Sequence, residues 1–353
     1  MEIPAQETGS TNPARRDTPR RVRRSRLPYF IAGATLTMLL AMTIGTAIIV
    51  RTIVATQSDD RFEAFSARAS NSIAAELRAA GLEADEVSGV LVGSPEITAD
   101  AFTEFASTLR DQEILAQTIG FVPLVKADGA DEFEASLRSQ GFTAYILEPS
   151  IQGADQFPVA FIDPPEGIPA DFGDDLSRDP IFAQAMDEAR DTGRTSATAP
   201  FINSGVTSFA MLDPIYRSGQ RVQSIDQRRG ALIGFGLMIY ETDQLMAGPI
   251  ARADLSEIQI SVTDLGPISA PATAALGLFV SPVITEDGGS RAVTSIEVGG
   301  REWRFDLKSP PWFGVSALER NVWIIVLGAG LAITTIATGA SYSLASSRQN
   351  ARS

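Results

Sequence analysis

The sequence contains neither cysteine nor histidine. Without cysteine no disulfide can form, so any folded domain must be held together by a buried apolar core. The chain also cannot present a Ser-His-Asp or Cys-His nucleophile, or a zinc site built from imidazole or thiolate ligands. Nor does it contain a G-x-x-x-x-G-K-[ST] phosphate-binding loop. We therefore expect a protein that is not an enzyme and that uses neither a metal nor a cofactor.

Basic residues are scarce in the middle of the chain. Residues 55–320 hold 19 of the 29 lysines and arginines but 40 of the 43 aspartates and glutamates, a net charge of −21. Such an excess of negative charge repels nucleic acids and anionic lipids, so neither is expected to bind this segment. A solvated acidic surface explains the charge without any specific function.

Charged residues are absent from two long apolar runs, Leu27 to Val50 and Val322 to Leu344. As helices rising about 1.5 Å per residue, both are long enough to cross a hydrocarbon core of about 30 Å. The first run exceeds the apolar part of a signal peptide, and no A-x-A-like cleavage site follows it. We predict transmembrane helices over 27–54 and 321–345, in contact with membrane lipid.

The flanks of these runs predict their orientation. Seven arginines lie between Arg15 and Arg26, and Arg348 and Arg352 follow the second run. Cytoplasmic flanks carry the excess of positive charge, so both termini are expected inside. The sequence thus predicts a two-pass protein of the plasma (inner) membrane. It has cytoplasmic tails at 1–26 and 346–353, and residues 55–320 are extracellular or periplasmic.

The residues after the first run predict a long helix that leaves the membrane. Apolar side chains recur three or four residues apart at Phe62, Phe65, Ala69, Ile73 and Leu77, and the next glycine is expected to end the helix at position 81. Two interpretations of this stripe are open. It packs on the rest of its own domain, or it forms a parallel dimer seam with a second copy.

The segment between the two apolar runs is expected to form two blocks, 55–240, which begins with this long helix, and 241–320, and helical and strand-like segments alternate in both. Thr98 and the Asp179-Pro180 pair are helix starts, and Gly299-Gly300 between two alternating runs is a hairpin turn. The predicted fold class is α+β, with two α/β subdomains on one long helix between two membrane helices. Strands are expected at 120–125, 142–147, 157–162, 207–212, 232–239, 258–262, 276–280, 293–298 and 302–307, and a further helix at 131–140.

Seven short motifs occur in a fixed order in the first block. They are Phe102-Thr-Glu-Phe105, Gly120-Phe-Val-Pro123, Gln156-Phe-Pro-Val-Ala-Phe-Ile-Asp-Pro164, Gly173-Asp-Asp-Leu176, Ala189-Arg-Asp-Thr-Gly193, Thr198-Ala-Pro-Phe201 and Asp213-Pro-Ile-Tyr216. In this order the segment from Phe62 to about Tyr240 resembles the CHASE domain. That domain is the extracellular sensory module of membrane histidine kinases and of nucleotide and diguanylate cyclases, including the plant cytokinin receptors. The resemblance implies a long helix with a membrane-distal and a membrane-proximal PAS-like subdomain, and a small ligand in the distal one.

The resemblance also implies ligand-binding residues. Thr198 falls where cytokinin receptors have a pocket threonine, and Asp155 falls one residue out of step with their pocket aspartate. Asp213 departs from the apolar residue usual before Pro-Ile-Tyr and would make the pocket more polar. A mostly apolar cleft would be completed by Phe157, Phe161, Phe201 and Phe209. The alternative is that these phenylalanines, on half-buried strands, are ordinary core residues.

The favoured function is the sensory part of a transmembrane receptor. It would bind an unknown small extracellular ligand, pair as a homodimer, and signal to a cytoplasmic kinase or cyclase output partner that the chain does not contain. Small residues every four positions permit close helix approach, at Gly33, Thr37, Ala41 and Gly45 and at Gly330, Thr334 and Thr338. The alternatives are a membrane-anchored scaffold that has no small-molecule ligand, and a hydrolase acting through carboxylates, for which no paired motif is present.

Overall fold

The structure is a computed structural model that describes residues 27–92, 97–112, 114–151, 153–164, 170, 172–252, 254–270, 274–283, 285 and 287–350. The predicted basic tail, 1–26, lies outside the described residues, as do residues 351–353. The chain divides into two compact units. The first combines the described residues up to Val54 with those from Ser316 onward, and the second is Ala55–Val315.

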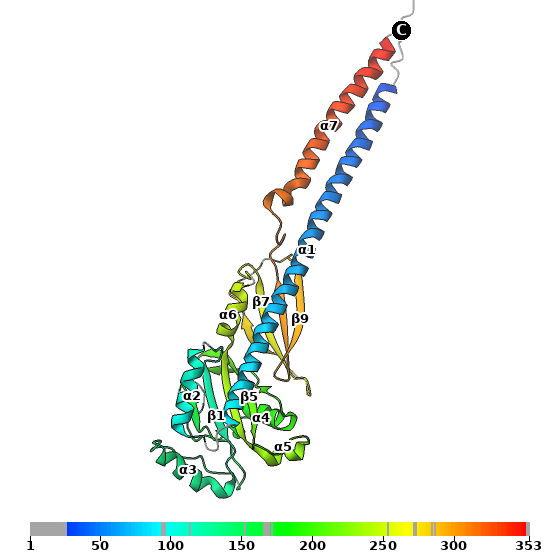
Figure 1. The fold of residues 1–353 in the computed structure, drawn as a ribbon. Helices are drawn as coiled ribbons and strands as arrows, with labels where there is room; N and C mark the ends of the chain where they lie inside the picture. Colours follow the sequence, from blue (N-terminus) through cyan, green and yellow to red (C-terminus); the bar gives the residue numbers. More distant parts are fainter. Residues whose placement is uncertain are drawn as a thin grey trace, which may run out of the picture. The chain divides into compact units, whose positions relative to one another are not determined.

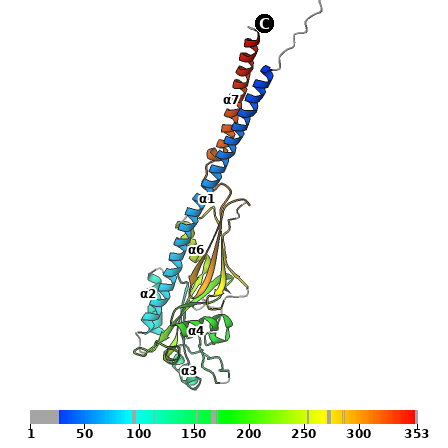
Figure 2. The same cartoon turned by 90° about the vertical axis from the view of Figure 1, so that its right-hand side faces the viewer.

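The first unit contains the N-terminal part of α1 (Leu27–Val92) and α7 (Ala317–Asn350), which lie side by side (Figures 1 and 2). Among the described residues, these two helices are long and apolar enough to cross a membrane. A Cβ atom added at Gly330 would lie 2.3 Å from Cγ2 of Thr43, so glycine is what allows this close approach. Thr334, one turn on, is also buried.

The predicted small-residue stripe of the second span therefore lies at a helix contact, whereas that of the first span does not. A Cβ added at Gly33 or Gly45 would meet nothing within 4 Å. In the part of α1 that belongs to the first unit, the buried apolar side chains are instead Ala32, Ala47 and Val54, and Thr43 is the residue that Gly330 approaches. With 3.6 residues per turn, this face is rotated away from the predicted stripe.

In the second unit α1 supplies one wall of the apolar core. Phe62, Ile73 and Leu77 are at most 3 % exposed. The rings of Phe62 and Phe65 pack on Phe313, at centroid distances of 5.5 and 5.0 Å. The apolar stripe is thus used within one chain, as the first of its two interpretations predicts.

The prediction that glycine ends this helix at position 81 is wrong. α1 continues through it to Val92 because the following turn also packs on the domain. Ala80 and Ala84 are buried, and the Ala80 carbonyl accepts a hydrogen bond of 2.9 Å from the Tyr240 hydroxyl. The Glu83 carboxylate accepts the backbone N–H of Leu115 at 3.0 Å. These contacts outweigh the roughly 1 kcal/mol that glycine costs inside a helix.

In the described part of the second unit, six antiparallel strands form one sheet, in the order β2-β1-β6-β5-β3 with β4 also paired to β5 (Figure 1). The long central pair, β5 and β6, carries the predicted strands at 207–212 and 232–239. The strands are β1 (Thr118–Pro123), β2 (Phe161–Asp163), β3 (Ser196–Ala197), β4 (Phe201–Asn203), β5 (Val206–Tyr216) and β6 (Leu232–Glu241).

The strand expected at 142–147 is absent. Its backbone groups bond to side chains of the preceding helix rather than to a neighbouring strand. Leu147 N–H donates to the Glu134 carboxylate at 2.8 Å, and the Tyr145 carbonyl accepts from Arg138 Nε at 3.0 Å. Gly173 holds this segment closely, because its φ is +93° and an added Cβ would lie 2.0 Å from the Ile146 carbonyl oxygen.

The six-stranded sheet separates two apolar cores. Along β5, Phe209 and Met211 belong to one core, while Ala210 and Leu212 belong to the other, as strand alternation requires. The first core also contains the apolar faces of α1 and of α2 (Ala99–Asp111). The second is covered by α4 (Pro180–Thr192).

Local signals set most helix ends. Thr98 caps α2 by accepting the Ala101 N–H at 3.3 Å, and Asp179 caps α4 by accepting the Ile181 N–H at 2.8 Å. Gly193 ends α4 with a φ of +71°, which glycine adopts without strain. The other helices are α3 (Ala130–Ser139), α5 (Ile225–Ala231) and α6 (Thr242–Arg252), with short 3-10 turns at Ala127–Gly129 and Leu176–Arg178.

After α6, a second antiparallel sheet forms with the order β8-β7-β10-β9 among the described residues. It contains the predicted hairpin, in which β9 and β10 turn at Gly299-Gly300. A buried ion pair, Arg301 with Asp264, follows the turn, and both side chains are at most 5 % exposed. The strands are β7 (Gln259–Pro267), β8 (Leu276–Val280), β9 (Arg291–Val298) and β10 (Arg301–Lys308).

The two sheets are joined directly. At the hairpin tip the Gly299 carbonyl accepts the backbone N–H of Ala197, in β3, at 2.8 Å. The Trp303 ring of β10 packs edge-on against Phe209 of β5, at a centroid distance of 4.8 Å. The Thr242 hydroxyl lies within 3.0 Å of carbonyls from both sheets, those of Thr207 and Leu278. Thus the four-stranded sheet is fixed to one edge of the six-stranded sheet.

Candidate functional site

Next to this joint the second unit contains a cleft of about 1190 Å³. Its walls come from the part of α1 around Leu77, the C-terminal end of α4 with the following loop and the start of β3, and β5. They are completed by the β5–α5 connection with Arg228 of α5, the start of the β7–β8 connection, and the Gly299-Gly300 hairpin. Residues from both sheets thus face one space, together with the long helix. Clefts at such junctions are common positions for small-molecule sites.

Several polar groups of the cleft are already fixed by hydrogen bonds. The Thr195 hydroxyl donates to Asp213 at 2.8 Å. The Ser269 hydroxyl donates to Glu188 at 3.2 Å, which links the β7–β8 connection to α4. Arg228 donates through Nε to the Asp191 carbonyl at 2.8 Å. These bonds order the walls of the cleft around the end of α4.

Tyr216 and Asp191 form further hydrogen bonds at the C-terminal end of α4. Burial raises the pKa of Tyr216 to about 12, so its hydroxyl stays protonated and donates to the Arg190 carbonyl at 2.8 Å. Asp191 accepts hydrogen bonds from Nε of Arg229 at 2.9 Å and from Nε of Arg190 at 2.8 Å. The guanidinium groups, first that of Arg229, hold the pKa of Asp191 far below its usual value of 3.8.

Replacing Asp191 by asparagine is expected to lower the unfolding temperature, by an amount that depends on pH. A carboxyl with a depressed native pKa binds fewer protons in the native than in the unfolded state. Its stabilisation is therefore complete above pH 3.8 and is lost as the pH falls through the lower native pKa. Thermal melting of wild type and Asp191→Asn should differ at pH 6 and converge towards pH 2.

The control for this prediction is Asp187→Asn, because Asp187 also pairs with Arg190 but its side chain is 66 % exposed. Exposed pairs contribute at most about 1 kcal/mol. Equal losses in the two variants, or a loss for Asp191→Asn that does not change with pH, would contradict the role given to Asp191.

The structure does not bring the seven predicted ligand residues together. Phe161 and Phe209 belong to the first core, and Phe157 and Phe201 contribute to the second, on the other face of the sheet. Phe161 stacks on Phe102 at 5.5 Å, and Phe201 contacts Phe182 at 5.4 Å. Phe157 packs on Phe235 at 5.5 Å. These are positions of core side chains, on strands for Phe161, Phe201 and Phe209 and in the segment before β2 for Phe157.

The two predicted aspartates, Asp155 and Asp213, have different surroundings. Asp155 is exposed and forms an ion pair of 2.6 Å with Lys126. Asp213 lines the cleft, and it is the member of the predicted set that does so. Among the described residues no group of three or more His, Cys, Asp or Glu side chains is arranged to hold a metal ion.

Thr198 is fully buried and completes the pairing of β5. Its backbone N–H donates to the Ala210 carbonyl at 2.8 Å, and its hydroxyl oxygen accepts the Ala210 N–H at 2.9 Å. The side chain thus substitutes for a strand carbonyl at the point where the chain leaves β3. Its predicted contact with a ligand remains a prediction, because it lies outside the cleft lining.

We expect Thr198→Val to lower the free energy of unfolding by about 1–3 kcal/mol, because the buried N–H of Ala210 loses its acceptor. Valine has nearly the shape of threonine, so packing is preserved. Thr198→Ser, which keeps the hydroxyl, is the matched control and should lose less. The measurement is thermal melting of the full chain in lipid nanodiscs. Equal melting of wild type and Thr198→Val would show that this bond does not stabilise the fold.

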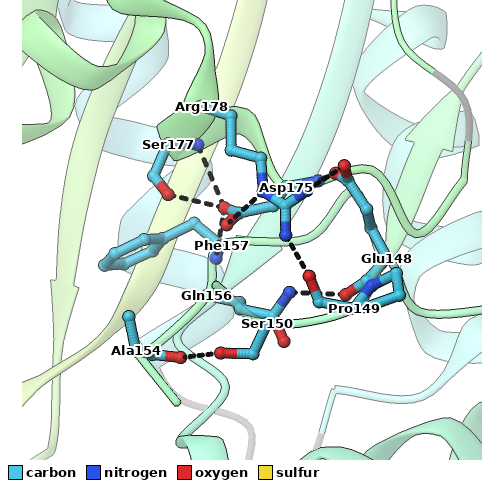
Figure 3. A network of polar contacts seen from close by, with 9 residues as sticks. All are labelled: Glu148, Pro149, Ser150, Ala154, Gln156, Phe157, Asp175, Ser177 and Arg178. Atoms are coloured by element: carbon cyan, nitrogen blue, oxygen red, sulfur yellow. Dashed lines mark hydrogen bonds and ion pairs between the residues drawn. The ribbon is translucent and has the colours of Figure 1, made fainter. Parts of the chain in front are cut away.

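A second cluster of polar groups lies outside the cleft lining, where the segment Glu148 to Ser150 meets Gln156, Phe157 and the turn from Asp175 to Arg178 (Figure 3). Asp175 accepts three hydrogen bonds, from Phe157 N–H at 3.0 Å and from the backbone and hydroxyl of Ser177 at 3.1 and 2.7 Å. Arg178 bonds to the Glu148 carboxylate and to the Pro149 carbonyl. Nε of Arg178 is buried without a hydrogen-bond partner among the described residues and lies 3.6 Å from the Asp175 carboxylate. The other bonds of this cluster hold the surrounding loops together.

Most of the cleft was not predicted from the sequence. Arg78, Glu188 and Arg194 line it, yet none belongs to a motif that marks a site. Arg78 lies on α1 and Arg194 follows α4, far away in sequence. The apolar stripe of the long helix is compatible with packing on its own domain, but the sequence does not say against which strands. The core shared by α1 and β5 brings these residues to one cavity.

Comparison with known protein families matches residues 95–275 to the CHASE domain. The matched segment begins before α2 and ends in the four-stranded sheet region, so it includes β5, α4 and most of the cleft walls. This chain belongs to the CHASE-domain family. The resemblance predicted from the seven motifs is thereby confirmed. This CHASE protein is accordingly an extracellular sensor, with its domain flanked by two apolar helices of membrane-spanning length.

Three solved structures similar to the CHASE protein share 13 or 14 % identity with it. "Methyl-accepting Chemotaxis protein X" aligns at a TM-score of 0.45, covering 72 % of this chain and 98 % of that chain, with 14 % identity. The ligand-binding domain of the Pseudomonas aeruginosa PAO1 amino acid chemoreceptor PctC, in complex with GABA, aligns at 0.42, with 14 % identity, 72 % and 99 % coverage. The corresponding PctB domain with L-Arg aligns at 0.40, with 13 % identity, 71 % and 94 % coverage. No curated protein matches the chain.

Proposed function

We propose that the protein is the extracytoplasmic small-ligand sensor of a transmembrane receptor, and that the ligand binds in the cleft between the two sheets. The observation that supports this is the composition of the cleft walls. One cavity of about 1190 Å³ is bounded by α1, by the six-stranded sheet and by the hairpin of the four-stranded sheet. A ligand there contacts all three and favours the arrangement of them that fits it best.

In this proposal, α1 transmits the effect of ligand binding from the cleft towards the membrane. The helix that carries Leu77 and Gly81 into the cleft is continuous in secondary structure with the first apolar span. A ligand changes the receptor only through a difference in affinity between two arrangements. Contacts with α1 that exist in one arrangement and not in the other supply that difference.

The remaining parts of the proposal rest on sequence. The two sheets correspond to the PAS-like subdomains of the CHASE resemblance, with the boundary near residue 240. Both termini are cytoplasmic, as the flanking arginines indicate. The chain acts as a homodimer and signals through α1 and α7 to a kinase or cyclase that is a separate protein or a further part of the product.

The first test is thermal melting of the full chain in nanodiscs against a metabolite panel. A ligand that binds only the native state at 100 times its Kd stabilises it by about 2.7 kcal/mol, which raises the melting temperature by several degrees. Gly81→Phe should abolish the shift, because Gly81 lines the cleft and an added Cβ there meets nothing within 4 Å. Ala75→Phe, at an exposed position of the same helix outside the cleft, should retain it.

The scaffold alternative predicts a different result. If no compound raises the melting temperature, and if the domain instead co-purifies with a membrane partner, the sensor proposal is wrong. If a compound raises it equally in wild type and in Gly81→Phe, the sensor proposal stands but the cleft is not the site.

A further inference from the structure

Two arginines in the cleft have no ion-pair or hydrogen-bond partner for their guanidinium groups among the described residues. They are Arg78 on α1 and Arg194 in the loop between α4 and β3, and both are exposed to the cavity. The neighbouring arginines are occupied: Arg228 binds backbone carbonyls and Arg229 binds Asp191. Other arginines, among them Arg217, Arg221 and Arg304, also lack such a partner among the described residues, but these three lie outside the cleft lining.

Of the three acidic side chains in the cleft, two are engaged. Asp213 accepts the Thr195 hydroxyl at 2.8 Å and Glu188 accepts the Ser269 hydroxyl at 3.2 Å. The third, Glu297, is exposed on β9. These carboxylates keep their charge and further acceptor sites, so the cleft presents both signs, and the guanidinium groups of Arg78 and Arg194 are its free charged donors among the described residues. Guanidinium groups bind carboxylates and phosphates in a bidentate geometry.

The cleft also has uncovered apolar surface. Leu82 on α1 is 68 % exposed and Ile268 after β7 is 50 % exposed, and both line the cavity. Exposed side chains of this size gain by contact with an apolar ligand body. An inorganic anion would leave this surface, and most of the volume, in contact with water.

Resting on the proposed function, we infer that the ligand is a small organic anion. Its carboxylate or phosphate group binds Arg78 and Arg194, and its apolar part contacts Leu82 and Ile268. Because Arg78 belongs to α1 and Arg194 to the edge of the six-stranded sheet, the anionic group connects the two. Removal of either arginine therefore weakens binding and also weakens the response that depends on α1.

Arginine modification tests the anion site while the natural ligand is still unidentified. The full chain in nanodiscs is treated with phenylglyoxal, and modification of each arginine is followed by mass spectrometry. Inorganic phosphate tests whether the site binds a phosphate group, and succinate tests whether it binds a carboxylate group. Each reaction is compared with one in sodium chloride at equal ionic strength. We expect Arg78 and Arg194 to be protected, and Arg221, exposed and outside the cleft lining, to react at the same rate throughout. Equal rates for all three arginines would overturn the inference.

Matched probes and variants provide the second measurement. Succinate, its neutral diamide and 1,4-diaminobutane have the same four-carbon chain but different charge. Affinity for succinate should fall roughly tenfold in Arg78→Gln and in Arg194→Gln, the loss expected for one charged hydrogen bond, and should be unchanged in Arg221→Gln. The diamide and the diamine should bind more weakly than succinate. If either binds as tightly, the inference is wrong.

These outcomes separate the two proposals. If anions protect both arginines and no metabolite changes the receptor, the anion site stands and the sensor function fails. Suppose that a neutral or cationic metabolite raises the melting temperature of the wild type but not of Gly81→Phe, and that no anion protects the two arginines from phenylglyoxal. The sensor function then stands, and the inference that the ligand is an organic anion is wrong.

Discussion

Replacing Arg301 by methionine is expected to lower the free energy of unfolding by about 3–5 kcal/mol, the usual result of removing one partner from a buried ion pair. Arg301 and Asp264 are 5 % and 1 % exposed, and Nε of Arg301 lies 3.1 Å from Oδ1 of Asp264. After the substitution the carboxylate stays buried without its counter-charge. The melting temperature of the full chain should then fall by roughly 10 °C.

The double variant Arg301→Met/Asp264→Asn separates charge from packing. Asparagine keeps an oxygen that accepts the Gly266 N–H, which Asp264 accepts at 3.1 Å in the wild type. With no buried charge left, most of the lost stability should return, since neutral replacements of buried pairs are often well tolerated. A double variant as unstable as Arg301→Met alone would show that the arginine acts through its shape and not through its charge.

The second large effect is expected at the hairpin tip that joins the sheets. Gly299 has a φ of +51°, and an added Cβ would lie 2.5 Å from the backbone nitrogen of Ala197. Gly299→Ala therefore combines the left-handed backbone cost of about 1–2 kcal/mol with overpacking of about 1–3 kcal/mol. Hydrogen exchange of the Ala197 amide, which donates to Gly299 at 2.8 Å, should accelerate because this contact opens first.

Gly300→Ala is the matched control for this prediction. Gly300 also has a positive φ, +76°, but a Cβ added there meets nothing within 4 Å. The backbone cost is shared, so the difference between the two variants reports the contact between the sheets alone. If both variants lose the same stability and leave the Ala197 amide equally protected, the hairpin does not hold the sheets together.

Local signals account for the parts of the fold that the sequence predicts well. Thr98, Asp179-Pro180 and Gly193 act through bonds or backbone angles within a few residues, and the hairpin at Gly299-Gly300 needs only its own two glycines. The prediction at position 81 was wrong because the same residue type ends one helix and is tolerated within another. The helix continues past Gly81 because Ala80 and Ala84 are buried, and this burial depends on strands that are distant in sequence.

The candidate site was less predictable for the same reason. Motif matching selected Thr198 and the four phenylalanines because they are characteristic in the sequence. However, characteristic residues of this kind also build the core, and the sheet places them on two faces. Arg78 and Arg194 have no distinctive local pattern, so their common cavity appears only when α1, α4 and β5 are assembled. Asp213 was recognised because it breaks an expected apolar pattern.

The unbroken course of α1 restricts the kind of motion that can carry a signal. Within the second unit α1 is helical without interruption from Ala55 to Val92. Within this part of the helix, a displacement of Leu77 or Arg78 is shared by the neighbouring turns, because their backbone hydrogen bonds join them. The amplitude is set by how far side chains such as Ile73 can shift in their packing before they must repack.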